Sequence, residues 1–258
     1  DEWREETFHN QEIVAKAGFE ANIIENHDQP RGASLFIPEE DYGFYSLSAL
    51  ATIIFCERGL PFLYQGQEIG MSNRQWKYDE FNDLETINQY QIALKAGMSK
   101  EQALEIARHH SRDNARTPMQ WTSGENAGFT KGTAWLKINP DYKEINVEDQ
   151  QNNPDSVLNY YRKLIALRKS DEFKNVFTYG EFIPEYEEMD HIQAFYRKDA
   201  AKCILVAANF GTDVASIELK GDVKKVLLSN QKDETVDCTK NRLNLKSCEV
   251  VVLEMEME

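Results

Sequence analysis

The sequence lacks long apolar runs and has little positive charge. No stretch approaches the ~18–20 consecutive apolar residues that a transmembrane helix needs, so we expect no membrane span. The 29 Lys and Arg residues are outnumbered by 44 Asp and Glu residues, and the formal net charge is −15. Such a chain repels a phosphate backbone, so we expect no nucleic-acid partner. A solvated acidic surface is the simplest interpretation of the charge.

Cysteine is also scarce. Cys56, Cys203, Cys238 and Cys248 are scattered, with no CxxC pair and no secretion signal. The first two lie in apolar patterns, where a thiol behaves as a small hydrophobic side chain. Whether the last two lie on neighbouring strands stays open. These features predict a reduced, cytoplasmic protein.

Residues 21–70 have the pattern of a strand–helix–strand unit. A short apolar run at 21–25 is followed by apolar side chains at helical spacing over about 44–58 and by a second run at 61–65. Gly59 is expected to end the helix, because glycine readily adopts the left-handed conformation found there. Two strands joined by one crossover helix should be parallel.

The region 71–150 shows little of this repetition. We expect two helices within it, at about 83–96 and 100–110, followed by a stretch rich in Gly, Asn and Pro. Ser99 and Gln102 form a capping-box pattern at the start of the second helix. A long insertion at the end of a strand is more often functional than structural filler.

A stronger helix is predicted over 154–169. Asn153 suits the N-cap, and Pro154 suits the first helical position because its missing N–H costs nothing there. Arg168 and Lys169 lie at its end, where positive charges interact favourably with the helix dipole.

The pattern changes at about residue 172, where short strands bounded by turn residues begin. The alternating or apolar runs that indicate strands lie at 192–196, 203–208 and 249–253. We therefore expect an α/β portion over 1–171 and an antiparallel β-sandwich domain over 172–258, which is an α/β plus all-β fold class.

Three motifs occur in a consistent order. They are NHDQPR at 26–31, GLPFLYQGQEIGM at 59–71 and RDNARTPMQW at 112–121. Together they resemble the oligo-1,6-glucosidase branch of glycoside hydrolase family 13, the α-amylase clan, and shorter matches extend the resemblance over almost the whole chain. NHD alone would be a weak signal, whereas three motifs at this spacing are specific.

The resemblance implies a fold. In that family a (β/α)8 TIM barrel carries the active site at the carboxyl ends of its strands. It implies that the chain is the C-terminal half of such an enzyme, with the 71–150 insertion after the last barrel strand, and that it begins inside a larger protein. In this correspondence, residues 21–25 and 61–65 are barrel strands seven and eight. Residues 44–58 and 154–169 are the helices that follow them, and a C-terminal β-domain begins at about 172.

It also implies roles for two neighbouring residues. Retaining glycoside hydrolysis needs a carboxylate nucleophile and a protonated carboxyl group about 5 Å apart. The family adds a third carboxylate that stabilises the transition state, and the resemblance assigns this role to Asp28. His27 is implied to hydrogen-bond the same sugar ring. Without the resemblance, Asp28 would be expected to cap the turn that Pro30 and Gly32 make plausible.

Arg112 opens the RDN motif. In the family this arginine closes the pocket around the terminal glucose, paired with an aspartate from the first half of the barrel. A planar guanidinium suits both a carboxylate and vicinal hydroxyls. A pocket closed at one end implies an exo-acting enzyme. We expect Arg116 to hold the loop together, and Arg31 is compatible with either role.

Other residues carry weaker expectations. Glu85 matches a position that contacts the second sugar, whereas its neighbour Asp83 suits a helix N-cap. Trp121 and Phe129 could stack on a sugar or simply pack. Glu68 is expected to be a buried hydrogen-bonding residue.

No cofactor is expected. No metal site is expected either, because the adjacent His109 and His110 have poor spacing for a metal on a helix. The family places the nucleophile and the acid on barrel strands four and five, and only about 20 residues precede the implied strand seven here. We therefore expect the chain alone to be inactive and to need the missing N-terminal half of the barrel.

The resemblance implies a retaining, exo-acting α-glucosidase that hydrolyses short α-1,6- or α-1,4-linked gluco-oligosaccharides. Two alternatives stay open. One is a trehalose-6-phosphate hydrolase, which shares much of this motif set. The other is a non-catalytic, glucosidase-like binding or partner subunit, against which the joint presence of NHD and RDN argues.

Overall fold

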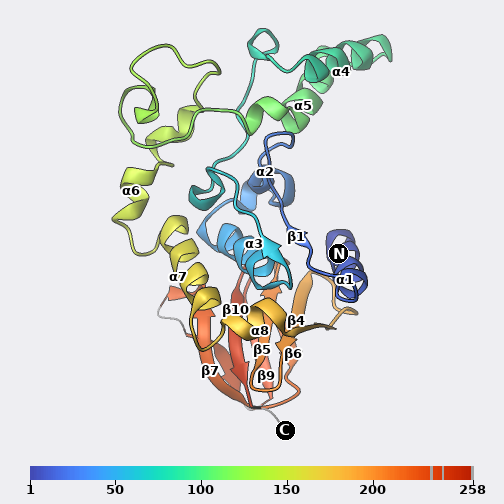
Figure 1. Cartoon of the computed structure of the whole chain (residues 1–258). Coiled ribbons are helices and arrows are strands. Elements are labelled where there is room, and N and C mark those ends of the chain that lie inside the picture. The colour runs from blue at the N-terminus through green and yellow to red at the C-terminus, as the bar shows by residue number, and fades with distance from the viewer. Residues whose placement is uncertain (233–234, 240, 257–258) are drawn as a thin grey trace. The chain divides into compact units, whose positions relative to one another are not determined.

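The computed structural model describes residues 1–232, 235–239 and 241–256 (Figure 1). The chain divides into two compact units. The first contains Asp1–Asn22, Gly43–Phe62 and Tyr160–Glu258, and the second contains Ile23–Tyr42 and Leu63–Asn159. The expected domain boundary at residues 171 and 172 stays a prediction.

In the first unit, two short strands pair in parallel. They are β1 (Ala21–Asn22) and β2 (Leu60–Pro61), and Ala21 lies opposite Leu60. The parallel pairing is confirmed, but both strands are shorter than predicted. Leu60 and Phe62 are about half exposed, although parallel strands are usually covered on both faces.

Helix α3 (Phe44–Cys56) lies between these strands in sequence. Ala49, Ala51 and Ile53 are fully buried on it, and the helix is buried on nearly all sides. It ends at Cys56, slightly before the predicted end. Gly59 follows at φ 142°, and a Cβ atom there would lie 2.5 Å from the carbonyl oxygen of Glu20. This turn therefore requires glycine.

The remainder of the first unit is built on two antiparallel sheets, as predicted. One has five strands in the order β3 (Glu181–Glu185), β4 (Ile192–Lys198), β5 (Cys203–Asn209), β10 (Val250–Met255) and β7 (Val223–Ser229). The other has the order β6 (Ala215–Glu218), β9 (Arg242–Leu245) and β8 (Asp237–Thr239).

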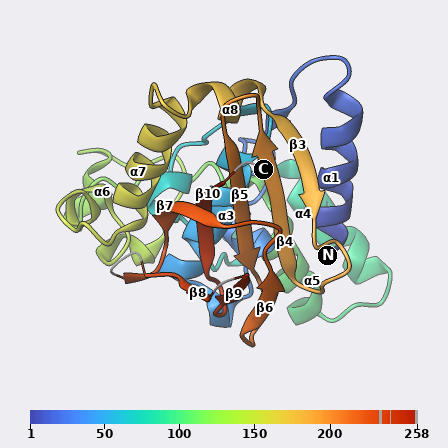
Figure 2. The same ribbon diagram turned by 90° about the horizontal axis from the view of Figure 1, so that it is seen from below.

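The central strands β5 and β10 are buried because both of their faces are covered. Leu205 and Leu253 point towards the second sheet, where they share a core with Ile217 and Leu243. Helix α3 packs against β5 and β10 (Figures 1 and 2). This explains why these strands read as continuous apolar runs rather than as alternating ones.

Three further helices belong wholly or mainly to this unit. They are α1 (Glu2–Val14), α7 (Val157–Lys169) and α8 (Lys174–Tyr179). Helix α1 lies beside β3 at the edge of the five-stranded sheet (Figure 2). Buried Arg4 on α1 donates to three backbone oxygens, those of Glu187, Met189 and Ile192.

Helix α7 begins later than predicted. Asn153 closes a turn instead, since its Oδ1 accepts the N–H of Asp155 at 3.0 Å. Ser156 provides the cap, because its Oγ accepts the N–H of Asn159 at 3.2 Å. Helix α8 was missed because strands were expected there.

The second unit is helical with long connections. Its helices are α2 (Gly32–Phe36), α4 (Leu84–Lys95), α5 (Lys100–His110) and α6 (Val147–Gln151). Single 3₁₀ turns lie at Glu39–Asp41, Gln67–Ile69, Tyr78–Glu80, Arg112–Asn114, Glu125–Gly128 and Pro140–Lys143. Helices α4 and α5 are confirmed almost at their predicted bounds.

The turn between α4 and α5 follows the expected chemistry. Ser99 Oγ accepts the N–H of Gln102 at 3.2 Å, and Gln102 Oε1 accepts the N–H of Ser99 at 3.0 Å, so the capping box is confirmed. The two helices enclose a small core around Trp76 and Tyr90. Within the described ranges, no helix is long and apolar enough to cross a membrane.

Candidate functional site

One buried arginine links the loops that carry the three motifs. Arg31 is fully buried, and its Nη1 donates to the carbonyl oxygen of Gln65 at 2.7 Å. Its Nε donates to the carbonyl oxygen of Asn114 at 3.2 Å. Its Nη1 also forms an ion pair with Glu25 Oε2 at 3.3 Å. The sequence left two roles open for Arg31; in the structure its guanidinium supports the loops from inside.

Asp28 projects from the first of these loops. Its backbone N–H donates to Asn26 Oδ1 at 2.7 Å, which forms a tight turn immediately before it. The side chain of Asp28 is 52% exposed and that of His27 is 72% exposed. The His27 Nε2 atom lies 3.3 Å from Asp28 Oδ2, so the two predicted residues present their polar atoms together.

Two arginines face Asp28. Arg116 Nη2 donates to Asp28 Oδ1 at 2.7 Å, and Arg116 Nε donates to the carbonyl oxygen of His27 at 2.8 Å. Arg112 Nη1 lies 3.7 Å from the same Oδ1. The structure thus brings together Asp28, His27 and Arg112. Arg116 holds the loop, as expected.

The strongest partner of Arg112 is Asp83. Arg112 Nε lies 3.1 Å from both carboxylate oxygens of Asp83, and Nη2 lies 2.5 Å from Oδ1. Asp83 is also the predicted N-cap of α4, because its Oδ1 accepts the N–H of Glu85 at 3.3 Å. The aspartate expected from the first half of the barrel lies outside this chain, so that pairing stays a prediction, and Asp83 is a partner that the sequence did not indicate.

The charges of this pair are strongly stabilised. Burial raises the pKa of Asp83, but hydrogen bonds from Arg112 and Thr86 outweigh it and lower the pKa to about 2. Hydrogen bonding to Asp83 raises the pKa of Arg112 in turn. Glu85, with a side chain 61% exposed, lies 3.6 Å from Arg112 Nη2. Both members of the pair therefore stay charged at neutral pH.

The remaining residues of the RDN motif point inward. Asp113 is fully buried, and its Oδ2 accepts the N–H groups of Asn82 at 2.7 Å and Asp83 at 2.9 Å. Asn114 Oδ1 accepts the indole N–H of Trp76 at 2.7 Å. These contacts tie the motif to the start of α4. Sequence reasoning did not foresee them, because the partners are about 30 positions or more apart.

The weaker candidates have mixed outcomes. Trp121 and Phe129 are 48% and 49% exposed, so neither is a core residue. Glu68 is half-buried rather than buried, and its Oε2 accepts the N–H of Gly66 at 2.7 Å. The expectation for Glu68 was therefore right about hydrogen bonding and wrong about complete burial.

Known proteins resemble the chain over most of its length. Residues 1–179 match the family described as "Alpha amylase, catalytic domain". The oligo-1,6-glucosidase of Heyndrickxia coagulans is 41% identical over 222 residues, which are 85% of this chain and 40% of that protein. The probable oligo-1,6-glucosidase 2 of Bacillus subtilis is 40% identical over 218 residues, which are 82% of this chain and 38% of that protein.

Solved structures agree with these relatives. The trehalose-6-phosphate hydrolase of Bacillus licheniformis superposes with a TM-score of 0.90 at 35% identity, covering 98% of this chain and 46% of its own. The isomaltulose synthase of Erwinia rhapontici gives a TM-score of 0.89 at 37% identity, with the same two shares of 98% and 46%. The chain spans about 40% of the length of the curated relatives it matches. By these matches, the chain belongs to the α-amylase catalytic-domain family, glycoside hydrolase family 13, in its oligo-1,6-glucosidase branch.

Proposed function

We propose that this chain is part of a retaining, exo-acting α-glucosidase that releases glucose from short α-1,6- or α-1,4-linked gluco-oligosaccharides. The observation that carries the proposal is the half-exposed Asp28 carboxylate, faced by Arg112 and Arg116, with Arg112 anchored on a buried carboxylate. The names of the relatives support the choice of substrate class.

Asp28 is proposed to stabilise the transition state. An ionised carboxylate only accepts hydrogen bonds, so it pairs naturally with sugar hydroxyls. Arg116 holds Oδ1, while Oδ2 lies towards His27, so this oxygen and the imidazole can meet the same sugar ring. Hydrogen bonds of this kind that strengthen in the transition state lower the barrier.

Arg112 is proposed to close the pocket at the terminal glucose. Its Nε and Nη2 are engaged by Asp83, while Nη1 faces Asp28. A guanidinium fixed on one side in this way keeps its Nη1 group, which lies 3.7 Å from Asp28 Oδ1, in place for vicinal hydroxyls. Glu85, beside the same guanidinium, is proposed to contact the second sugar.

The proposal assigns neither the nucleophile nor the general acid to this chain. It takes β1 and β2 as barrel strands seven and eight, α3 and α7 as the helices that follow them, and residues 172–258 as the C-terminal β-domain. The chain alone is then inactive and requires the N-terminal half of the barrel as its partner. A cytoplasmic location remains part of the proposal.

A trehalose-6-phosphate hydrolase is the enzymatic alternative, and one solved neighbour has that name. A phosphorylated substrate needs a cation that is free to bind it. Arg112 and Arg116 are both paired with carboxylates, so the candidate site favours an uncharged sugar. A non-catalytic binding subunit is the remaining alternative.

The test is Asp28→Asn in the full-length protein that carries this chain, with Asp79→Asn as the matched exposed control. We expect Asp28→Asn to reduce kcat/KM for isomaltose and maltose by on the order of 10²-fold or more, as for other transition-state contacts. Asp79→Asn should have no effect. Unchanged hydrolysis by Asp28→Asn would refute the assignment, and faster turnover of trehalose 6-phosphate than of isomaltose would favour the alternative.

A further inference from the structure

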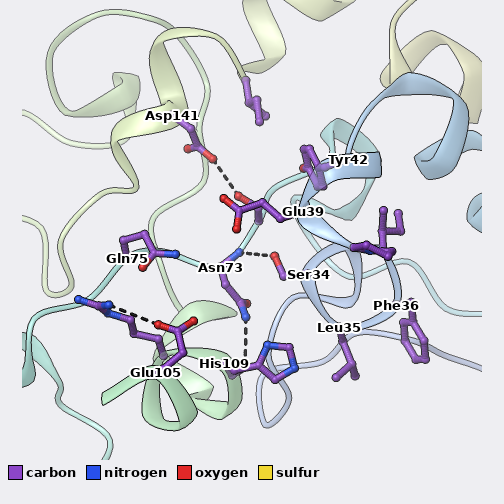
Figure 3. Close-up of a pocket in the computed structure, with 15 residues that line it drawn as sticks. Ser34, Leu35, Phe36, Glu39, Tyr42, Asn73, Gln75, Glu105, His109 and Asp141 are labelled. Atoms are coloured by element: carbon purple, nitrogen blue, oxygen red, sulfur yellow. Dashed lines mark hydrogen bonds and ion pairs between the residues drawn. The ribbon is translucent and has the colours of Figure 1, made fainter. Parts of the chain in front are cut away.

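The second unit contains a hollow that shares no lining residue with the site around Asp28. Its volume is ≈ 670 Å³, and it opens between the segments 34–42, 72–75, 105–109 and 141–145 (Figure 3). Pockets that hold small molecules usually measure ~300–1,000 Å³. We call this hollow the Gln75 pocket.

The walls of the Gln75 pocket are cross-linked. Ser34 Oγ accepts the backbone N–H of Asn73 at 2.9 Å, and the Asn73 amide donates to the carbonyl oxygen of His109 at 3.1 Å (Figure 3). Ser72 Oγ donates to Asp141 Oδ2 at 3.1 Å, so a third segment is tied in. Walls that are fixed in advance reduce the cost of ordering on binding.

The lining combines apolar and polar surface. Leu35, Pro38 and Ile145 contribute apolar groups. Gln75 and Glu39 are exposed, and among the lining residues drawn in Figure 3 their side chains make no hydrogen bond. An amide both donates and accepts, and a carboxylate accepts. Apolar patches beside such groups suit a sugar, which presents C–H faces and a ring of hydroxyls.

The charge of the lining disfavours anions. Three carboxylates, those of Glu39, Glu105 and Asp141, line the pocket together with one arginine. That arginine, Arg108, is partly engaged, because its Nε donates to the carbonyl oxygen of Trp76 at 2.7 Å and its Nη1 pairs with Glu105 at 3.4 Å. Among the described lining residues, a phosphate or carboxylate ligand would therefore meet three carboxylates and one arginine that already donates through Nε and Nη1.

We propose that the Gln75 pocket binds an uncharged saccharide of two or three sugar units, as a non-catalytic site separate from the one around Asp28. Gln75 and Glu39 contact the hydroxyls, and Leu35 and Ile145 contact the sugar faces. This site does not require the proposed hydrolysis, because none of its residues belongs to the candidate catalytic machinery.

The test is calorimetric titration of the full-length protein with isomaltotriose, in an Asp28→Asn background that limits turnover. Gln75→Ala and Glu39→Ala should each weaken binding at one site by roughly fivefold or more, the effect of one lost hydrogen bond to the ligand. Glu40→Ala is the matched control, since Glu40 is the residue next to Glu39, is also exposed and lies outside the pocket. It should bind like the parent.

Two outcomes would overturn the proposal. The first is that Gln75→Ala and Glu39→Ala bind isomaltotriose as Glu40→Ala does. The second is that glucose 6-phosphate or spermidine displaces the saccharide from this site, which would assign the pocket to a charged ligand. Hydrolysis of isomaltose by the same variants with Asp28 intact should be unchanged, so failure of this proposal is distinguishable from failure of the proposed hydrolase activity.

Discussion

Arg112 and Asp83, which are 29 positions apart, form a two-pronged ion pair whose carboxylate is almost completely buried. The Asp83 side chain is 3% exposed and that of Arg112 is 32% exposed. Nε and Nη2 of Arg112 point to Asp83, and Nη1 points to Asp28. A partly exposed pair contributes little to stability, so its main effect is on where the guanidinium lies.

Asp83→Asn should release Arg112 without removing the cap of α4, because Asn is as good an N-cap as Asp. We expect kcat/KM for isomaltose to fall about tenfold or more, as a misplaced charged hydrogen-bonding group would cause. The unfolding free energy should fall by only about 1 kcal/mol. Steady-state kinetics and urea unfolding of the full-length protein measure both.

Ser99→Ala is the control for this prediction, because it removes the cap of α5, where no arginine is bound. It should lower stability and leave kcat/KM unchanged. Equal kinetics for Asp83→Asn and the parent would show that Asp83 does not position Arg112.

Glu57 should make the protein less stable as pH rises. Burial raises the pKa of Glu57 from 4.5 to about 8, with the Glu20 carboxylate adding to the rise and Arg197 opposing it. Between these two values the folded chain keeps a proton that the unfolded chain has lost, so stability falls across this window. The fall is about 5 kcal/mol at most, at about 1.4 kcal/mol per pKa unit.

Glu57→Gln should abolish this fall and be more stable than the parent at pH 8. The measurement is urea unfolding between pH 5 and 9, with Glu12→Gln as an exposed control. If the pH slope of Glu57→Gln matched that of Glu12→Gln, burial of an ionisable Glu57 would be the wrong explanation.

Exposed apolar side chains on and next to the short parallel strands β1 and β2 predict that the 258-residue chain self-associates. Leu60 is 56% exposed and Phe62 is 51% exposed. Apolar side chains that cluster on a surface are sites of association. We expect light scattering to detect oligomers or aggregates, and Phe62→Glu should reduce them. Leu84→Glu, at a more exposed position on α4, should not. A monodisperse monomer for the unchanged chain would contradict the prediction.

The elements that sequence reasoning predicted well depend on short-range patterns. Helix α3 follows from apolar spacing, and the start of α5 follows from the Ser99 capping box. The start of α7 was wrong because Asn153 and Ser156 compete as caps, and Asn153 closes a turn instead. Helices as short as α6 have too few residues for a period to be seen.

The site was predictable only in part. The motifs indicated Asp28 and Arg112, and the structure places Arg112 Nη1 3.7 Å from Asp28 Oδ1. The anchoring of Arg112 on Asp83 was not predictable, because the two residues come together only when the chain between them folds. Asp83 also satisfies an N-cap pattern completely, so nothing in the sequence called for a second role.

Replacing Gly66 with alanine should destabilise the protein by more than its left-handed backbone conformation alone explains. It has φ 93°, and a Cβ atom there would lie 2.5 Å from Met71 Sδ and 2.9 Å from Nη1 of Arg31, which links the site loops. Gly97 has the same φ of 93°, but a Cβ atom at that residue would have no neighbouring atom within 4 Å. Gly97→Ala therefore incurs only the cost of the left-handed backbone, roughly 1 kcal/mol.

Gly66→Ala should incur that cost and a steric one, ~1–3 kcal/mol more, as in other overpacked sites. Urea unfolding of both variants separates the two contributions. Displacement of Arg31 should also reduce kcat/KM for isomaltose in Gly66→Ala and not in Gly97→Ala. Equal stability losses in the two variants would mean that the surroundings of Gly66 yield to a methyl group, and that Arg31 does not hold the loops rigidly.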